Sequence, residues 1–388
     1  MLQFALAMKD RLRSMFMLIC RLFPAQNHKV VFSSFSGKSY SDSPKAISEA
    51  LHQIRPDADI VWLFRDGASK ANIIPDYVRT ARNHSWHALR EMSTARAWVD
   101  NMPMSDYTRK RNHQLYVQTW HGDRGFKKCL YDAPDHPKGV EMIEQWIADV
   151  MVTGSRHCEQ MYKTAFGFQG EPLRVGSPRN DILIHPSAAK IIEVKRKLGI
   201  PQDVKLLLYA PTMRNAPRRK GEKQQIQPID LLRTMDALGS RLSGEFYCLV
   251  RCHSTQLGLG GLPNDDRIID ASTYEDMADL LLISDVLITD YSSSAGDFVL
   301  TGRPLILFHN DKEQFEREER TFYFDISDTP FVSVRDQQTL EDHIAQLTPE
   351  SAEKNDRDIL DFYGAYETGE AAMRVAERIA QAMDERRK

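Results

Sequence analysis

Apolar and polar residues follow one repeated pattern from His28 onward: a short β-branched run, a turn rich in Gly, Ser, Asp or Pro, and an amphipathic helical stretch. Buried parallel strands give short continuous apolar runs, and the helices between them show an apolar face at helical spacing. In the first repeat, a strand beginning at His28 precedes a helix that starts at the polar cluster 41–43 and Pro44. The pattern predicts a parallel α/β fold.

The repeats fall into two series. The first contains the expected strands HKVVFSSF, DIVWLF, ARAWVDNM, QLYVQTW and ADVMVTGS, and the second contains VKLLLYAPT, EFYCLVRCH, DRIIDAS, DVLITDY and RPLILFH. A polar helical stretch ending at Gly199 separates them. We therefore expect two Rossmann-like domains, 28–187 and 188–388, whose parallel sheets face a central cleft, with the C-terminal helix closing the second domain.

The first 27 residues are expected to form a separate amphipathic helix. Lys9, Arg11, Arg13 and Arg21 interrupt its apolar run, so it lacks the roughly 20 consecutive apolar residues that spanning a membrane requires. No small-residue cleavage pattern follows, which argues against a secretory signal. The helix either lies on a membrane surface or packs against its own domain or a partner subunit, and the sequence favours none of these.

Composition narrows the function classes. The chain has 388 residues, 42% of them hydrophobic, which is enough for two cores. Its 51 Lys and Arg residues against 54 Asp and Glu give a net charge of -3, which argues against a general affinity for nucleic acid. The five cysteines are scattered without paired spacing, which is typical of a protein in a reducing cytoplasm.

The segment Gln118-Thr119-Trp120-His121-Gly122 follows an expected strand directly. A histidine at the carboxyl end of a strand, beside a glycine that permits a tight turn, lies where an α/β fold exposes a catalytic group. Its ordinary pKa of about 6.5 lets it accept a proton at neutral pH. A lone histidine is more often structural, and a lone tryptophan more often core, so this interpretation depends on the motifs that follow.

A second motif runs from Thr289 and Asp290 into Ser292, Ser293 and Ser294, with a helix expected from residue 295 to residue 300. Backbone N–H groups at a helix start, together with hydroxyl side chains, can bind a phosphate. A plain helix cap would give the same sequence.

Basic residues follow two other expected strands. Arg251 and His253 end EFYCLVRCH, and Arg214 follows LLLYAPTM. These side chains could neutralise a pyrophosphate, although a packed neutral histidine is an equal alternative for His253. The D-x-D patterns resemble surface turns, so we expect no metal site, and we expect no cofactor.

In chain order, VQTWHG, VGSPRNDIL, LLYAPTMR, RCHS and ADLLLISDVLITDYSSSAGDFVLTGRPLILF resemble the CDP-glycerol glycerophosphotransferase family of teichoic-acid and capsule synthesis. Five ordered motifs are far more specific than any one of them. The sequence departs from the family after WHG, where 123–127 is DRGFK in place of Thr-Pro-Leu-Lys, and at Ser254 and Thr321.

The resemblance implies a GT-B-like pair of Rossmann domains, no metal requirement, and His121 as general base. It also implies that His253 and the serines 292–294 bind the donor pyrophosphate, to which we add Arg251, Arg214 and Thr289. Residues expected to support the site or face the acceptor are Gly122, Trp120, Asp290 and Arg179. The expected activity is transfer of glycerol phosphate from CDP-glycerol, or ribitol phosphate from CDP-ribitol, to a lipid-linked or glycan hydroxyl, with release of CMP at the inner face of the cytoplasmic membrane.

Two alternatives stay open. A GT-B glycosyltransferase that uses a nucleotide-sugar donor would share the fold, because fold does not fix function. A catalytically silent assembly protein of the same pathway would explain the altered loop after His121.

Overall fold

The computed structural model of the chain describes residues 2–66, 73–137, 141–212, 214, 229–252 and 262–385. Its contacts divide it into two compact units. Unit 1 consists of Met1–Asp123, His136–Asp181 and Tyr366–Lys388, and unit 2 consists of Arg124–Asp135 and Ile182–Ala365. Each unit is built on a parallel sheet, which confirms the predicted α/β class with two parallel sheets.

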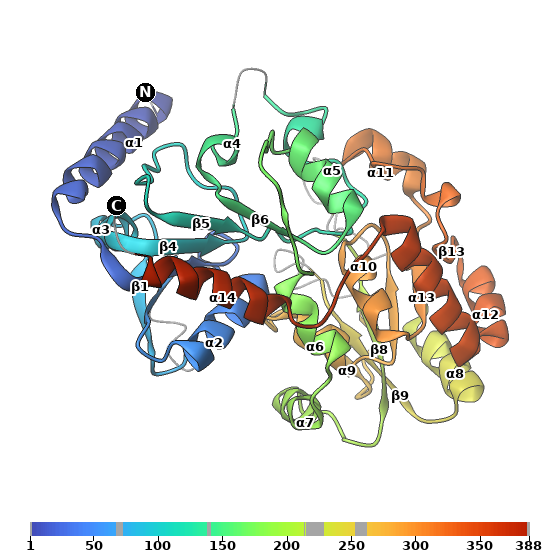
Figure 1. The fold of residues 1–388 in the computed structure, drawn as a ribbon. Coiled ribbons are helices and arrows are strands. Elements are labelled where there is room, and N and C mark those ends of the chain that lie inside the picture. The colour runs from blue at the N-terminus through green and yellow to red at the C-terminus, as the bar shows by residue number, and fades with distance from the viewer. Residues whose placement is uncertain are drawn as a thin grey trace. The chain divides into compact units, whose positions relative to one another are not determined.

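Within the described part of unit 1, seven parallel strands form one sheet in the order β3-β2-β1-β4-β5-β6-β7 (Figure 1). The strands are β1 (Gln26–Ser33), β2 (Asp59–Phe64), β3 (Val78–Arg82), β4 (Ala95–Asp100), β5 (Leu115–Gln118), β6 (Val150–Thr153) and β7 (Leu173–Arg174). The strand order reverses between β1 and β4, and ligands of such folds bind at the carboxyl ends of the strands on either side of this point.

Alternate residues of each strand in unit 1 face two different cores. Val30 and Phe32 of β1 join the core under α2 (Asp42–Ile54), whereas Val31 joins the core under α3 (Trp86–Thr94). Successive strand side chains point to opposite faces, so a sheet covered on both sides needs continuous apolar runs. This explains why the strands were visible in the sequence. The shorter helices of unit 1 are α4 (Glu144–Ile147), α5 (Arg156–Thr164), η1 (Cys20–Leu22) and η4 (Pro178–Asn180).

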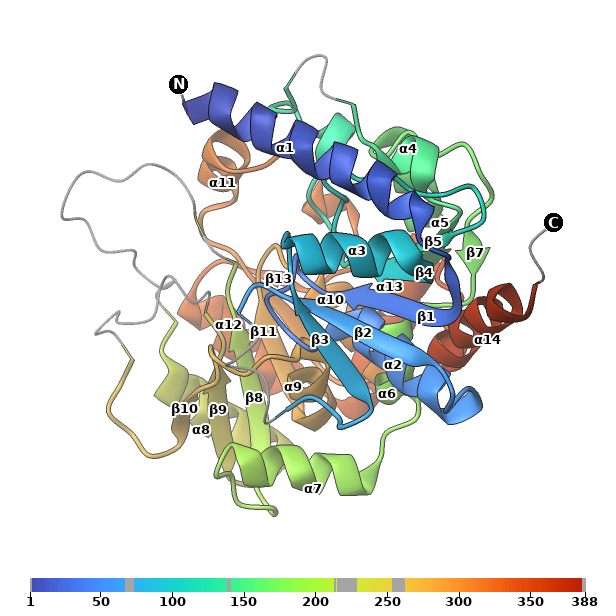
Figure 2. The same cartoon turned by 90° about the vertical axis from the view of Figure 1, so that its left-hand side faces the viewer.

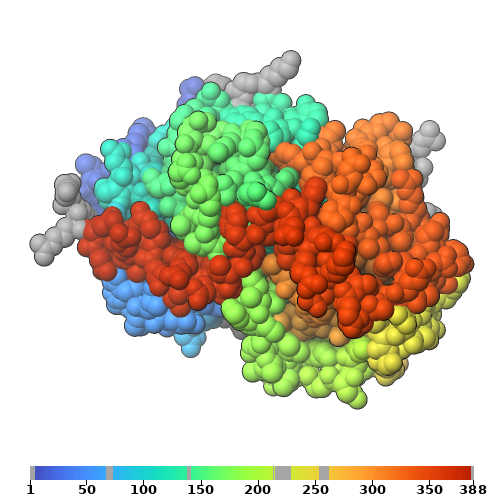
Figure 3. Space-filling model, turned by 45° about the vertical axis from the view of Figure 1, so that its right-hand side comes forward, coloured from blue at the N-terminus to red at the C-terminus, as the bar shows by residue number. Residues whose placement is uncertain are grey.

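The C-terminal helix α14 (Ala371–Asp384) belongs to unit 1, which differs from the expected division at residue 187. Its apolar stripe, which includes Val375, Ile379 and Met383, completes the core that α2 covers. At the surface, α14 lies beside α2 (Figure 3). The carboxylate of Asp181 accepts hydrogen bonds from the backbone N–H groups of Ala371 at 3.0 Å and Ala372 at 2.7 Å, which holds the start of the helix. The sequence showed the stripe but not the sheet that it covers.

The described part of unit 2 contains six parallel strands in the order β10-β9-β8-β11-β12-β13. They are β8 (Lys205–Ala210), β9 (Phe246–Val250), β10 (Ile268–Asp270), β11 (Val286–Thr289), β12 (Leu305–Phe308) and β13 (Ser333–Val334). The order is that of the first six strands of unit 1, and it reverses between β8 and β11. Among the described strands, β3, β7 and β13 fall outside the predicted runs, because β3 has a polar sequence and β7 and β13 have two residues each.

Helices cover both faces of this second sheet as well. Leu206 and Leu208 of β8 face one core, and Leu207 and Tyr209 face the other. The helices are α6 (Asp181–Ile184), α7 (Ala188–Lys197), α8 (Leu231–Leu242), α9 (Met277–Ile283), α10 (Ser294–Phe298), α11 (Lys312–Glu318), α12 (Gln337–Gln346) and α13 (Pro349–Tyr363), with the short turns η3 (Leu130–Asp132), η6 (Val299–Thr301) and η7 (Ile326–Asp328).

Helix α1 (Leu2–Ile19) lies on α3 (Figure 2). Met17 is fully buried in the contact, and the Phe16 ring meets Trp86 edge-on with centroids 5.0 Å apart. On the opposite side, Met8, Leu12, Met15 and Ile19 recur at helical spacing and are exposed. The helix therefore packs on its own unit with one face and leaves a second apolar face uncovered. Within the described residues, no helix has the length and apolar character needed to cross a membrane.

Candidate functional site

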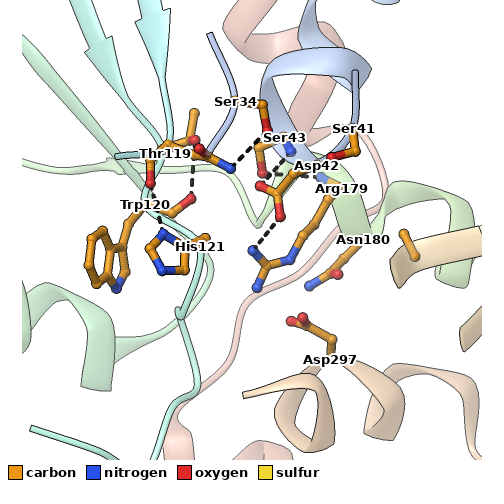
Figure 4. A network of polar contacts seen from close by, with 12 residues as sticks. Ser34, Ser41, Asp42, Ser43, Thr119, Trp120, His121, Arg179, Asn180 and Asp297 are labelled. Carbon is orange, nitrogen blue, oxygen red and sulfur yellow. Dashed lines mark hydrogen bonds and ion pairs between the residues drawn. The ribbon is translucent and has the colours of Figure 1, made fainter. Parts of the chain in front are cut away.

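His121 lies just beyond the carboxyl end of β5 in unit 1. Its Nδ1 is 2.8 Å from the backbone carbonyl oxygen of Asn101, which follows β4 (Figure 4). A carbonyl can only accept, so Nδ1 carries the hydrogen, and in the neutral ring Nε2 carries the lone pair. The contact fixes both the orientation and the tautomer of the imidazole. This is the arrangement that a general base needs.

Asn101 is itself held firmly. It is fully buried, its Oδ1 accepts a hydrogen bond from the backbone N–H of Phe35 at 2.7 Å, and its Nδ2 donates to Ser34 Oγ at 3.2 Å. These bonds join the end of β4 to the end of β1, the two strands where the order reverses. The Phe35 ring also meets the His121 ring edge-on, with centroids 5.4 Å apart. Asn101 was not predicted, because a single asparagine after a strand resembles an ordinary turn.

The tight turn before His121 forms at Trp120 and not at Gly122, which corrects the expected role of the glycine. Trp120 has a φ of 53°, in the left-handed region that a bulky residue rarely adopts. Its backbone N–H donates to Gln118 Oε1 at 2.8 Å, and its buried ring lies against His121 with centroids 4.1 Å apart. Trp120 therefore forms one wall of the histidine site.

Arg179 lies at η4 of unit 1, in a buried position. Its Nη1 is 3.1 Å from Asp42 Oδ2, and its backbone N–H donates to Ser43 Oγ at 3.4 Å (Figure 4). Asp42 begins α2 with a φ of 64°, so the ion pair stabilises a backbone conformation that few residues adopt. The structure thus gives Arg179 a supporting contact with the start of α2.

In unit 2, Arg214 lies beyond the end of β8 and is held by two carboxylates. Its Nη2 is 2.9 Å from Asp290 Oδ2, which follows β11, and its Nε is 2.8 Å from Asp311 Oδ2. The guanidinium also stacks over the rings of Tyr291 and Phe315. Burial alone would lower the pKa of Arg214, but the two carboxylates raise that pKa above its ordinary value. Arg214 is therefore a fixed cation at the reversal point of the second sheet.

The serine motif follows directly. Ser292 Oγ is 2.8 Å from Ser294 Oγ, and Ser293 precedes α10 without a side-chain capping bond. The Thr289 hydroxyl donates to the Ala210 carbonyl oxygen at 2.7 Å, which ties β11 to β8. Helix α10 has five residues, shorter than predicted, so its dipole is small. Binding of an anion here would depend on the hydroxyl and backbone N–H groups themselves.

Of the remaining predicted residues, Arg251 follows β9, where its Nη1 donates to the Tyr274 carbonyl oxygen at 2.5 Å. His253 and Ser254 lie outside the described residues. Within the described part of the chain, no group of three or more His, Cys, Asp or Glu side chains is arranged to hold a metal ion.

The sequence analysis did not single out three charged residues in the same region of unit 2 as Arg214. Asp311 follows β12, Arg320 follows α11, and Lys127 lies in the segment after His121. Asp311 could have been found as a polar residue at the end of a strand. Lys127 carried no such signal, because its position depends on how the chain passes from one unit to the other.

Two known proteins with similar sequences match nearly the whole chain. The chain is 30% identical over 391 residues to the teichoic acid poly(glycerol phosphate) polymerase of Bacillus spizizenii, covering 95% of this chain and 96% of that protein. It is 32% identical over 374 residues to the teichoic acid glycerol-phosphate transferase of Staphylococcus aureus, covering 90% and 92%. It spans only 45% of the poly(glycerol phosphate) polymerase of Staphylococcus epidermidis, at 32% identity over 81% of this chain.

Solved structures match nearly the whole chain. The wall teichoic acid polymerase TagF superposes with a TM-score of 0.84 at 28% identity, covering 98% of this chain and 95% of that chain. The UDP-GlcNAc 2-epimerase of Neisseria meningitidis shares the fold alone, with a TM-score of 0.51 at 13% identity over 91% of this chain and 100% of that one. The family model described as CDP-glycerol:poly(glycerophosphate) glycerophosphotransferase matches residues 14–381. The chain belongs to the CDP-glycerol:poly(glycerophosphate) glycerophosphotransferase family.

Proposed function

We propose that the chain transfers glycerol phosphate from CDP-glycerol to a hydroxyl acceptor in the synthesis of a cell-surface polymer, teichoic acid or capsule. Family membership and two full-length relatives that act on glycerol phosphate support this proposal. The observation that carries it is the histidine after β5, whose Nδ1 is fixed by the Asn101 carbonyl oxygen. A ring held this way presents a proton acceptor at neutral pH.

The proposed reaction is one substitution at phosphorus. The acceptor oxygen bonds to the β-phosphorus of CDP-glycerol, the bond from that phosphorus to the oxygen bridging to CMP breaks, and CMP leaves. His121 Nε2 accepts the proton of the acceptor hydroxyl. Phosphoryl transfer needs alignment and neutralisation of charge more than covalent catalysis. Arg214 and Ser292 to Ser294, with Arg251 and His253 as further candidates, are proposed to stabilise the pyrophosphate charge.

The proposal also specifies which polyol phosphate is transferred and which acceptor receives it. A relative named as a teichoic acid ribitol-phosphate primase, from Bacillus spizizenii, is 26% identical over 94% of this chain, so CDP-ribitol is the competing donor. A TagF variant soaked with CDPG superposes over 98% of the chain with a TM-score of 0.80, which favours CDP-glycerol. The proposed acceptor is a lipid-linked or glycan hydroxyl.

The experiment compares labelled CDP-glycerol with CDP-ribitol, each with and without a lipid-linked acceptor, and follows release of CMP. We expect CMP and a new phosphodiester from CDP-glycerol only when the acceptor is present. A glycosidic product from a nucleotide sugar would favour a glycosyltransferase. Release of no CMP from any donor and acceptor pair would contradict the proposed activity.

We further propose that the chain works at the inner face of the cytoplasmic membrane and attaches to it through α1. The exposed residues Met8, Leu12, Met15 and Ile19 form an apolar stripe, and Lys9 and Arg11 add positive charge beside it. An apolar stripe flanked by basic residues suits an anionic lipid surface.

Co-sedimentation with anionic vesicles tests the attachment. A Leu12→Glu and Met15→Glu variant should lose vesicle binding, whereas Ile192→Glu, at an exposed apolar position of α7, should keep it. Equal vesicle binding by the wild type and by both variants would overturn the proposed attachment.

A further inference from the structure

After His121, the chain passes from unit 1 to unit 2 between two consecutive residues, Asp123 and Arg124. Asp123 belongs to unit 1, where its Oδ2 accepts a hydrogen bond from the Gly154 backbone N–H at 2.7 Å. Arg124 belongs to unit 2, where it is fully buried. Its Nε donates to the Gly296 carbonyl oxygen at 2.5 Å, and its Nη2 is 3.3 Å from Asp297 Oδ1. Residues 124–135, which we name the crossing segment, are thus anchored on unit 2.

The crossing segment is fixed along its length by unit 2. The backbone N–H of Lys128 donates to the Thr321 carbonyl oxygen at 2.9 Å, and the Tyr323 N–H donates to the Phe126 carbonyl oxygen at 2.8 Å. Phe126 is fully buried in the unit 2 core. Lys127, between these contacts, pairs with Phe322 in an isolated antiparallel bridge. The backbone of Lys127 is therefore held in one place.

The Lys127 ammonium group lacks a partner of its own. It is half-buried and makes no hydrogen bond or ion pair with any residue that the structure describes. The charges that act on it are Asp290 beyond β11, Arg214 beyond β8, and Arg320 and Glu319 after α11. Asp290 is already paired with Arg214. Burial, opposed by Asp290, lowers the pKa of Lys127 to about 8.

The three cations at this place differ in what they can offer a ligand. Arg214 is compensated by Asp290 and Asp311, and Arg320 is exposed to solvent. A half-buried ammonium without a partner costs free energy that an anion would recover. A phosphate group, which carries negative charge and several acceptor oxygens, suits such an ammonium near two further cationic side chains.

We propose that Lys127 binds a phosphate of the CDP-activated donor, and that the crossing segment brings it to the ends of β8 and β11 for this purpose. The inference rests on the proposed function and adds to it a donor-binding residue within the loop that departs from the family sequence. One short stretch of chain then carries the proposed base, His121, in unit 1 and a phosphate ligand in unit 2.

A binding titration with CDP-glycerol, CDP and cytidine tests the proposal. Lys127→Met should weaken binding of CDP-glycerol and CDP by about 10- to 100-fold, the usual effect of losing a hydrogen bond to a charged group, and leave cytidine binding unchanged. Lys128→Met is the matched control, because neighbouring side chains of an extended segment point to opposite sides. It should bind all three ligands like the wild type.

The pH dependence provides a second readout that does not need the methionine variant to fold. A lysine with its pKa near 8 loses its proton as the pH rises, so the wild type should lose affinity for CDP-glycerol above pH 8. Lys127→Arg keeps its charge and should bind with a flatter profile. Equal affinities and equal profiles in all variants would overturn the role of Lys127 alone. A wild type that binds no CDP compound would overturn the proposed function and this inference together.

Discussion

The strand order reverses at one point in each sheet. The two reversal points have the same topology, but the side chains at the first are neutral and those at the second are charged. In each unit, a polar residue beyond the fourth strand bonds to the chain beyond the first strand: Asn101 Oδ1 accepts from the Phe35 N–H, and Asp290 Oδ1 accepts from the Thr212 N–H at 2.8 Å. Unit 1 uses a neutral amide next to a histidine. Unit 2 uses a carboxylate that also holds an arginine.

From this difference we infer that one strand order serves two chemical tasks. The shared order brings polar side chains to one edge of each sheet, but it does not determine their charge. A neutral surrounding suits an imidazole that must accept a proton, and fixed cations suit a pyrophosphate. Variants that disturb one reversal point should therefore have effects of a different kind from variants at the other.

The largest effect on stability is expected at the charged reversal point of unit 2. Arg214→Met removes the cation between Asp290 and Asp311 and leaves two carboxylates close together, of which Asp290 is 1% exposed. Breaking a buried ion pair from one side costs about 3–5 kcal/mol. Chemical denaturation should show this loss. Arg233→Met, which breaks an exposed ion pair with Glu341 in the same unit, should leave the midpoint nearly unchanged.

At the neutral reversal point of unit 1, Asn101→Ala should lower the stability of the fold by less than Arg214→Met does. It leaves the N–H of Phe35 without its acceptor in a buried place, which costs about 1–3 kcal/mol. Because Asn101 also positions the carbonyl oxygen that His121 contacts, kcat should fall while the affinity for CDP-glycerol stays the same. A fall in donor affinity with unchanged kcat would mean that the two reversal points do not divide the work as described.

The smallest effect, when it is taken per unit of pH, comes from a buried carboxyl. Asp100 ends β4, and burial raises its pKa to about 8, from an ordinary value near 3.8. The folded protein then binds more protons than the unfolded chain, so the contribution of this group is fully present below about pH 4 and is lost as the pH rises toward 8. The slope is at most about 1.4 kcal/mol per pH unit. Asp100→Asn should reduce this slope in unfolding experiments, and an unchanged slope would rule out a buried neutral carboxyl.

The fold was largely predictable because both sheets are covered on both faces. Such strands must be apolar throughout, and polar residues that directly follow them stand out, as Asp290 does after β11. The short strand β13 and the polar strand β3 give no such signal. The partner of α14 could not be predicted either, since an apolar stripe shows that a helix packs but not what it packs on.

Residues of the candidate site could be proposed from the sequence only where a side chain of suitable chemistry directly follows a strand. His121 met both conditions. The left-handed Trp120 did not, because its conformation is imposed by tertiary contacts and glycine was the better candidate from sequence. Lys127 was invisible for a different reason: Arg124 and Gly296 meet so closely that a Cβ on Gly296 would lie 2.4 Å from Arg124 Cβ, and no sequence pattern encodes such a contact across the chain.

The most direct test of the division between the two units is His121→Gln, assayed for CMP release and for binding of CDP-glycerol in parallel. Removing a general base lowers turnover by about 10²- to 10⁴-fold. We predict a loss in this range with donor affinity equal to that of the wild type, because the donor contacts are proposed to lie in unit 2. Unchanged turnover in a folded His121→Gln protein would contradict the account.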